Sequence, residues 1–169
     1  MRAHPPIGRP RGGEVSAMQM HVQAQWTSGM RFEGANADGL RAVMDADPQH
    51  GGTAGGPSPM ETLMLALAGC TGMDVIPILQ KMRAPVDRFT IEVTADRAGT
   101  HPKVLTAIHL RYVAAGPGLR VDQVEKAVAL SQDTYCSVSA MLRKAAPVTY
   151  DTTVIDTHAE QPSLAAPAR

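Results

Sequence analysis

Ser58 to Gln80 reads SPMETLMLALAGCTGMDVIPILQ, and the rest of the chain is organised around this segment. It holds Cys70, one of only two cysteines in the chain. Its start is well marked, because Ser58 is a typical N-cap residue and Pro59 suits the first position of a helix. Glu61 then completes a capping box with Ser58. The pattern predicts a long helix with a cysteine in its middle.

Apolar side chains recur along this stretch at spacings of three and four residues, which is typical of a helix with a buried face. Small residues between them make the rest of the helix thin, so we expect it to be buried on most sides. A cysteine there is either inert packing or a reactive group in a shaped pocket. The apolar stripe consists of Met60, Leu63, Met64, Leu67, Cys70 and Met73.

Composition excludes several classes of protein. The 169 residues suit one domain with a real core, and 16 basic residues balance 16 acidic ones, so no excess charge indicates nucleic acid as a partner. The longest apolar run in the helix, 63–69, is far shorter than the roughly 20 residues that span a bilayer. No apolar segment typical of a secretory signal precedes it. We therefore expect no membrane partner and a cytoplasmic location.

Three segments differ in composition. Residues 1–17 combine Pro, Gly and Arg with little apolar content and predict a disordered N-terminal extension, with Met18 as a candidate true start. Residues 18–156 carry the regular patterns and predict one folded domain. Residues 157–169 predict a loose C-terminal tail.

Strand patterns precede the helix. Residues 18–27 alternate between apolar and polar side chains, which is typical of a half-buried strand. Two further short strands, 30–33 and 40–45, flank a turn cluster and predict an antiparallel meander. The Gly- and Pro-rich segment 47–57 then predicts a loop.

After the helix, residues 89–95 and 104–114 alternate cleanly and predict a hairpin. Helical spacing returns at 121–131, a short helix is expected to start near Ser137, and 148–155 predicts a last strand. Strands, one helix, strands, helices and a strand in this order indicate an α+β fold, not a doubly wound one.

The two cysteines, Cys70 and Cys136, form no CxxC pair, and none of the six histidines lies at ligand spacing to either, so we expect no metal. The GGTAGG segment lacks the GK[ST] of a phosphate loop, so no nucleotide cofactor is expected either. Cys136 begins a helix, where exposed N–H groups favour a thiolate, whereas Cys70 would need a nearby cation to ionise. The residues alone leave two alternatives: a redox pair, or two buried small hydrophobic residues.

Two motifs together carry a resemblance. GPSPMETLMLALAGCTGMDVIPILQKMR, followed by YCSVSAMLRKAAPV, resembles the OsmC/Ohr family of cysteine-based hydroperoxide reductases, and its OsmC-like branch in particular. The resemblance covers 18–156. It implies an α+β OsmC-like fold in which antiparallel sheets pack around a long central cysteine helix. It also implies an intertwined homodimer with two active sites at the subunit interface.

The resemblance also implies a chemistry of the peroxiredoxin type and a role in the oxidative stress response. Cys70 would be the peroxidatic thiolate that attacks an organic or fatty-acid hydroperoxide, and Cys136 the resolving cysteine. A dithiol, for which a lipoyl-type molecule is one candidate, would reduce the resulting disulfide. Arg31, in SGMRFEG, matches the family's activating arginine, and Arg41 is the second candidate.

One position departs from the family pattern. The glutamate that holds the arginine stands ten residues before the cysteine in the hydroperoxidases, where this chain has Met60. Glu61 is nine residues before, and one residue rotates a helix by about 100°. Two roles therefore remain for Glu61: a residue of the candidate site, or a helix cap alone. Asp74, one turn after Cys70, would raise the pKa of that thiol unless a hydroxyl or backbone group binds it.

The shifted glutamate motivates a second hypothesis. The same fold could serve a non-catalytic redox-sensing protein, or one that binds a small hydrophobic ligand in a pocket lined by the Met-rich helix.

Overall fold

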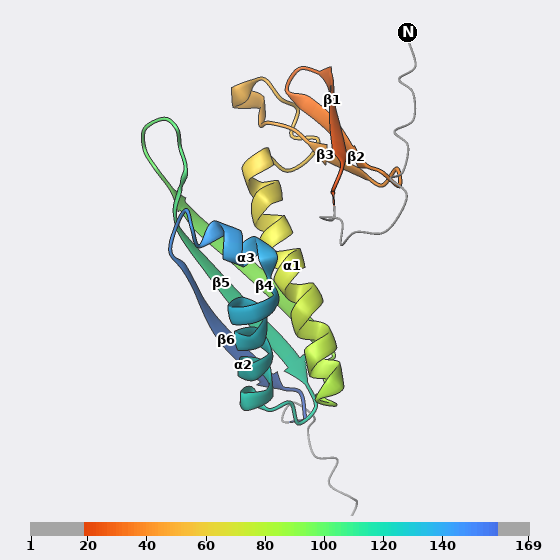
Figure 1. Ribbon diagram of the computed structural model, residues 1–169, viewed down its shortest axis with the longest axis vertical. Coiled ribbons are helices and arrows are strands. Elements are labelled where there is room, and N and C mark those ends of the chain that lie inside the picture. The colour runs from red at the N-terminus through yellow and green to blue at the C-terminus, as the bar shows by residue number, and fades with distance from the viewer. Residues whose placement is uncertain (1–18, 159–169) are drawn as a thin grey trace, which may run out of the picture. The chain divides into compact units, whose positions relative to one another are not determined.

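The computed structural model describes residues 19–158, which form two compact units divided between Pro57 and Ser58 (Figure 1). The predicted extension, 1–17, lies outside the described residues, and so does 159–169, which is most of the predicted tail. The assignment of 18–156 to one domain stays a prediction.

The first unit is an antiparallel meander of three strands. Strand β1 (Val22–Ser28) pairs with β2 (Arg31–Asn36), which pairs with β3 (Arg41–Met44). Gly29 links the first two strands at a φ of 49°, in the left-handed region that glycine adopts at little cost. A short 3-10 turn, Pro48–His50, lies in the loop that follows. The predicted meander is confirmed.

The burial expected for the first strand is wrong for this chain by itself. All seven residues of β1 are exposed, and so are apolar side chains such as Trp26 at 61% and Phe32 at 39%. A single-layer sheet must bury its apolar face against another layer, and the meander contains no second layer. The first unit therefore presents apolar surface that a partner layer would cover.

A buried carboxylate fixes the Gly-rich loop of the first unit. Asp45 Oδ2 accepts hydrogen bonds from the Thr53 hydroxyl at 2.7 Å, from Thr53 N at 3.1 Å and from Gly55 N at 3.1 Å. These bonds favour the ionised form, and the Thr53 hydroxyl contributes most to lowering the pKa of Asp45 from 3.8 to about 2. The loop is thus anchored at its centre.

The second unit packs three helices on one face of a three-stranded sheet (Figure 1). Its first helix is the predicted cysteine helix, and a π-helical turn, η2, joins the other two. In chain order the elements are α1 (Pro59–Lys81), β4 (Arg88–Arg97), β5 (Leu105–Gly116), α2 (Val121–Leu130), η2 (Ser131–Tyr135), α3 (Ser137–Leu142) and β6 (Val148–Asp156).

The second sheet is mixed. Strands β4 and β5 form the predicted antiparallel hairpin, but β6 runs parallel to β5, which corrects the expectation of purely antiparallel sheets. The reason is the connection: α2, η2 and α3 cross over the sheet between β5 and β6, and a crossover returns the chain in the same direction. The α+β class is confirmed.

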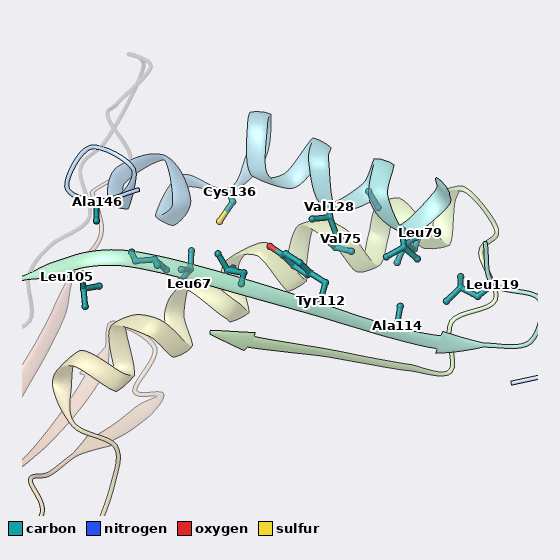
Figure 2. Packing of buried hydrophobic residues seen from close by; sticks show 14 residues of the cluster. Leu67, Val75, Leu79, Leu105, Tyr112, Ala114, Leu119, Val128, Cys136 and Ala146 are labelled. Carbon is teal, nitrogen blue, oxygen red and sulfur yellow. The ribbon is translucent and has the colours of Figure 1, made fainter. Parts of the chain in front are cut away.

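The buried stripe of α1 differs from the predicted one. Leu67, Thr71, Val75 and Leu79 are almost fully buried, at a spacing of four residues, whereas Met73 is 79% exposed. Only one side of α1 meets α2 and β4, so the expected burial on most sides is wrong for the single chain. Figure 2 shows Leu67, Val75 and Leu79 in the core with Tyr112 of β5. Each buried leucine contributes roughly 1.5–3 kcal/mol to folding.

Helix α1 is also the one helix within residues 19–158 that is long and apolar enough to cross a membrane. A core helix of a soluble protein meets the same criteria. The packing of α1 against α2 and β4 accounts for its apolar residues on the buried face.

A cysteine pair as candidate active site

The capping box of α1 sets the position of Cys70 along the helix. Ser58 Oγ accepts from Glu61 N at 3.3 Å, and Glu61 Oε2 accepts from Ser58 N at 2.7 Å. With Pro59 in the first turn, the predicted helix start is confirmed. The Glu61 carboxylate is engaged at the cap, and its role at the cysteine site stays a prediction. Cys70 itself lies half-buried in mid-helix.

Cys136 is the N-cap residue of α3 and is only 2% exposed. Its N–H donates to the Ser131 carbonyl at 2.8 Å and closes the π-helical turn η2. Its Sγ accepts from Ser139 N at 3.4 Å. The side chain belongs to the buried cluster of the second unit (Figure 2). Cys136 is thus buried, and its predicted position at the start of a short helix is confirmed.

The structure brings the two cysteines together. Cys70 Sγ lies 3.9 Å from the hydroxyl of Ser137, the residue that follows Cys136. The Cys70 side chain is also close enough to Cys136 to contribute to raising the pKa of that thiol. The tertiary fold therefore brings residues that are far apart in sequence close to each other, and the roles of the two cysteines in one site stay a prediction.

The pKa of Cys136 is shifted in the direction opposite to the one expected from its place at a helix start. Burial is the largest influence and raises the pKa of its thiol above 9.0, and Cys70 raises it further, while hydrogen bonds with Ser139 lower it. Helix α3 has only six residues, so the favourable effect of its N-terminus is outweighed by desolvation. The pKa of the Cys136 thiol is therefore raised, and not lowered as its place at a helix start suggested.

Asp74 was expected either to lie unpaired near Cys70 or to bind a hydroxyl or backbone group, and the structure gives it a hydroxyl partner. Its Oδ2 accepts a hydrogen bond from Ser131 Oγ at 3.0 Å. Around it, Thr71, Tyr112, Ser131 and Gln132 are buried and hydrogen-bonded to one another. Sequence reasoning missed this polar cluster; the available signal was the polar run SQDTY between an apolar helix and Cys136.

The predicted activating arginine lies in the first unit, on β2. Arg31 Nε and Nη2 donate to Glu33 Oε1 at 3.2 and 3.1 Å, and both side chains are about one-third exposed. A Cβ added to Gly55 would lie 2.6 Å from Arg31 Nη1, so the loop backbone also confines this guanidinium. Arg41 is 3.7 Å from Glu33 and 77% exposed. Arg31 is the better-held cation, and its pairing with Cys70 stays a prediction.

Glu33 is a residue that sequence reasoning missed. It stands two positions after Arg31 on the same strand, so both side chains point to the same face of the sheet. That spacing was the available signal.

An apolar pocket of about 300 Å³ opens in the second unit between the start of α1, the start of β5 and the end of α3. Of the described residues that line it, only Lys103 is charged. The others are Met60, Leu63, Pro102, Val104, Leu105, Ile108, Leu142, Ala145 and Ala146. Its size and lining suit a small hydrophobic molecule.

Metal chemistry finds no support in the part of the chain that the structure describes. No group of three or more His, Cys, Asp or Glu side chains between residues 19 and 158 could hold a metal ion.

Residues 51–151 match the family model described as OsmC-like protein. The chain belongs to the OsmC-like family. The matched range contains both cysteines and Glu61, whereas Arg31 and Glu33 precede it.

Several proteins are similar to this OsmC-like chain. Protein YhfA of Escherichia coli K12 is 37% identical over 136 residues, which cover 80% of this chain and 98% of YhfA. A hypothetical protein from Aquifex aeolicus has a solved structure with a TM-score of 0.68 and 27% identity, over 82% of this chain and 98% of that one.

An organic hydroperoxide resistance protein OsmC from Legionella pneumophila has a similar structure, with a TM-score of 0.61 and 17% identity. The match covers 82% of this chain and 99% of that one. Together the comparisons place the fold among OsmC-like proteins.

Proposed function

We propose that the protein is a thiol-dependent peroxidase that reduces organic or fatty-acid hydroperoxides. The observation that carries the proposal is the juxtaposition of a half-buried cysteine, Cys70, with a buried one, Cys136. The hydroperoxide resistance named for the Legionella pneumophila protein supports it at the level of the family.

The reaction balances with two cysteines and one dithiol. The Cys70 thiolate attacks the terminal peroxide oxygen, the O–O bond breaks, and the alcohol leaves with a proton, so that Cys70 becomes a sulfenic acid. Cys136 displaces that hydroxyl, water leaves, and a disulfide forms. A dithiol, for example of the lipoyl type, then reduces the disulfide and restores both thiols.

The environments of the two cysteines suit these different roles. Cys136 is a buried thiol whose pKa is raised, so it is a poor first nucleophile, but it lies near Cys70 and can act once the sulfenic acid has formed. Cys70 is accessible enough to meet a peroxide.

Arg31 supplies the cation in this proposal. A guanidinium beside Cys70 would favour the thiolate and stabilise the negative charge that develops on the leaving oxygen. Glu33 fixes the orientation of Arg31 through two hydrogen bonds to one oxygen. Glu61 contributes to the site only if it does more than cap α1.

The same proposal includes an intertwined homodimer in the cytoplasm. The uncovered apolar side chains support self-association, because surface patches of this kind mark interaction sites. They are Leu65 at 61% and Met73 at 79% exposed on α1, with Tyr135 at 57% and Met141 at 61% nearby in sequence to Cys136.

The test is turnover of cumene hydroperoxide with dithiothreitol as the reductant. We expect Cys70→Ser to abolish turnover, and Cys136→Ser to allow one oxidation of Cys70, trapped by dimedone, without disulfide formation. Arg31→Met should slow the first step about 100-fold or more. Full turnover by Cys70→Ser would refute the proposal, and Arg97→Met on the other sheet is the matched control.

The apolar pocket favours a second candidate, a protein that binds a small hydrophobic ligand without changing it. Titration with a fluorescent fatty acid tests it: saturable binding that Leu63→Arg abolishes, in a protein without turnover, would support this candidate. Rapid, stoichiometric sulfenic acid formation at Cys70 would count against it.

A further inference from the structure

A buried polar cluster joins the surroundings of the two cysteines. Thr71 Oγ1 lies 2.8 Å from Tyr112 Oη and 2.8 Å from Ser131 Oγ. Gln132 Nε2 donates to Tyr112 Oη at 2.6 Å and to Thr71 Oγ1 at 3.3 Å. All four residues are at most 3% exposed, so water cannot replace these bonds at low cost.

Arg143 fixes which way the Gln132 amide faces. Its Nη2 donates to Gln132 Oε1 at 3.0 Å, and its Nη1 donates to the Gln132 carbonyl at 2.8 Å. The amide oxygen is thereby occupied, and the NH₂ group must face Tyr112 and Thr71.

The other end of the cluster is also fixed. Ser131 Oγ donates to the Asp74 carboxylate at 3.0 Å, so Thr71 donates to Ser131 and Tyr112 donates to Thr71. Each hydroxyl then has one consistent donor direction, from Tyr112 to Asp74. A buried network satisfied in this way holds its elements in one arrangement.

The cluster links the two backbone segments that carry the cysteines. Thr71 directly follows Cys70, and the Ser131 carbonyl accepts the N–H of Cys136 at 2.8 Å. The hydroxyl contact between Thr71 and Ser131 therefore ties the cysteine helix to the π-helical turn that presents Cys136. The hydrogen bond between Tyr112 and Thr71 connects this contact to β5.

We infer that Thr71, Ser131 and Tyr112, oriented by Gln132 and Arg143, are positioning residues that hold Cys70 and Cys136 ready to form a disulfide. The inference rests on the cysteine pair of the proposed function but not on hydroperoxide turnover. Holding two groups in reacting geometry raises the effective concentration of one thiol at the other.

The experiment measures that effective concentration directly. The reduced protein is equilibrated with mixtures of oxidised and reduced glutathione, in which two protein thiols become a disulfide as one oxidised glutathione becomes two reduced molecules. Acid-quenched samples are analysed by mass spectrometry. We expect Thr71→Val and Ser131→Ala to lower the effective concentration about tenfold each, because both remove the buried hydrogen bond between Thr71 and Ser131. Thr71→Ser, which keeps the hydroxyl, should restore it to within about twofold.

Two controls make the same chemical changes outside the cluster. Thr62→Val removes a hydroxyl that binds the Ser58 carbonyl in the same helix, and Tyr150→Phe removes one from the ring that packs edge-on against Tyr112. Both should leave the effective concentration unchanged. Tyr112→Phe is the milder variant if Thr71→Val fails to fold, and it should give a loss of the same sign.

Unchanged values in folded Thr71→Val and Tyr112→Phe would overturn the inference, and so would an equal loss in the two controls. A protein that forms the disulfide with the expected dependence on Thr71, yet turns over no hydroperoxide, would support the inference and refute the proposed peroxidase.

Discussion

At the scale of single residues, two cysteines of identical chemistry differ because of what surrounds them. Cys136 is buried at the start of α3 and its pKa is raised, chiefly by desolvation, whereas Cys70 is half-buried in mid-helix. Helix α3, which Cys136 caps, has only six residues, and the favourable effect of its N-terminus does not offset the desolvation of the thiol. Burial, and not position at a helix start, decides the direction in which the pKa of Cys136 shifts.

The raised pKa of Cys136 predicts that the folded protein loses stability at high pH. A group whose pKa is raised on folding stabilises the protein fully below its unfolded pKa, here about 9, and loses that contribution as the pH rises through the folded pKa. The free energy of unfolding of the reduced protein should therefore fall between pH 8 and pH 10. Urea denaturation at both values checks this.

The matched variant for this prediction is Cys136→Ser. It should show a smaller decrease between the two pH values, with the remainder coming from groups such as Tyr112, whose pKa is also raised by burial. Equal decreases in the variant and the wild type would contradict the assignment to Cys136.

At the scale of elements, local signals specify the start of α1. The Ser58 hydroxyl and the Glu61 carboxylate satisfy each other's backbone N–H groups, and Pro59 needs no partner for its nitrogen. None of these bonds depends on the rest of the fold.

Loss of this cap should destabilise the second unit moderately. Ser58→Ala removes the acceptor for the Glu61 N–H, and we expect the free energy of unfolding to fall by about 1 kcal/mol in urea denaturation. Ser58→Asp retains an acceptor and should stay within about 0.5 kcal/mol of the wild type. A loss as large in Ser58→Asp as in Ser58→Ala would show that the cap is not the cause.

The π-helical turn η2 is the opposite case. It depends on the bond from Cys136 N to the Ser131 carbonyl and on contacts of Ser131 and Gln132 with α1 and β5. No side-chain pattern within five residues specifies such a turn, so periodicity predicted only a break between two helices.

At the scale of the whole molecule, helix α1 has large apolar side chains that no other element of the second unit covers. Leu65 and Met73 lie eight residues apart on one side of the helix, and the small residue Gly69 lies between them. A thin, apolar helix face is suited to close packing against another helix, such as the same helix in a second copy of the chain.

The proposed homodimer predicts the effect of a charge on this face. Met73→Glu would bury two carboxylates at a symmetric interface, so the dissociation constant of the dimer should rise by about 100-fold or more. Sedimentation velocity over a concentration series measures it. Gln80→Glu, at an exposed position of the same helix, is the control and should leave the dimer intact; a wild-type protein that is monomeric at all concentrations would refute the proposal.

Much of this architecture was predictable because its determinants are local. Alternating spacing indicated β1, β4 and β5, helical spacing indicated α1 and α2, and the resemblance carried by the paired motifs implied that Cys70 and Cys136 meet. The parallel pairing of β6, the buried stripe through Thr71 and the carboxylate partner of Arg31 were not predictable in this way. Each depends on residues brought together by the fold.

The sequence by itself determined the capped cysteine helix, the order of the elements and the residue types available for chemistry, since hydrogen bonds within a turn and side-chain periodicity need only near neighbours. Which face of α1 is buried, why the pKa of Cys136 is raised and which hydroxyl groups link the two cysteine segments depend on the tertiary structure. These properties follow from desolvation and hydrogen bonding among α1, β5 and η2, and no one of these segments contains that information alone.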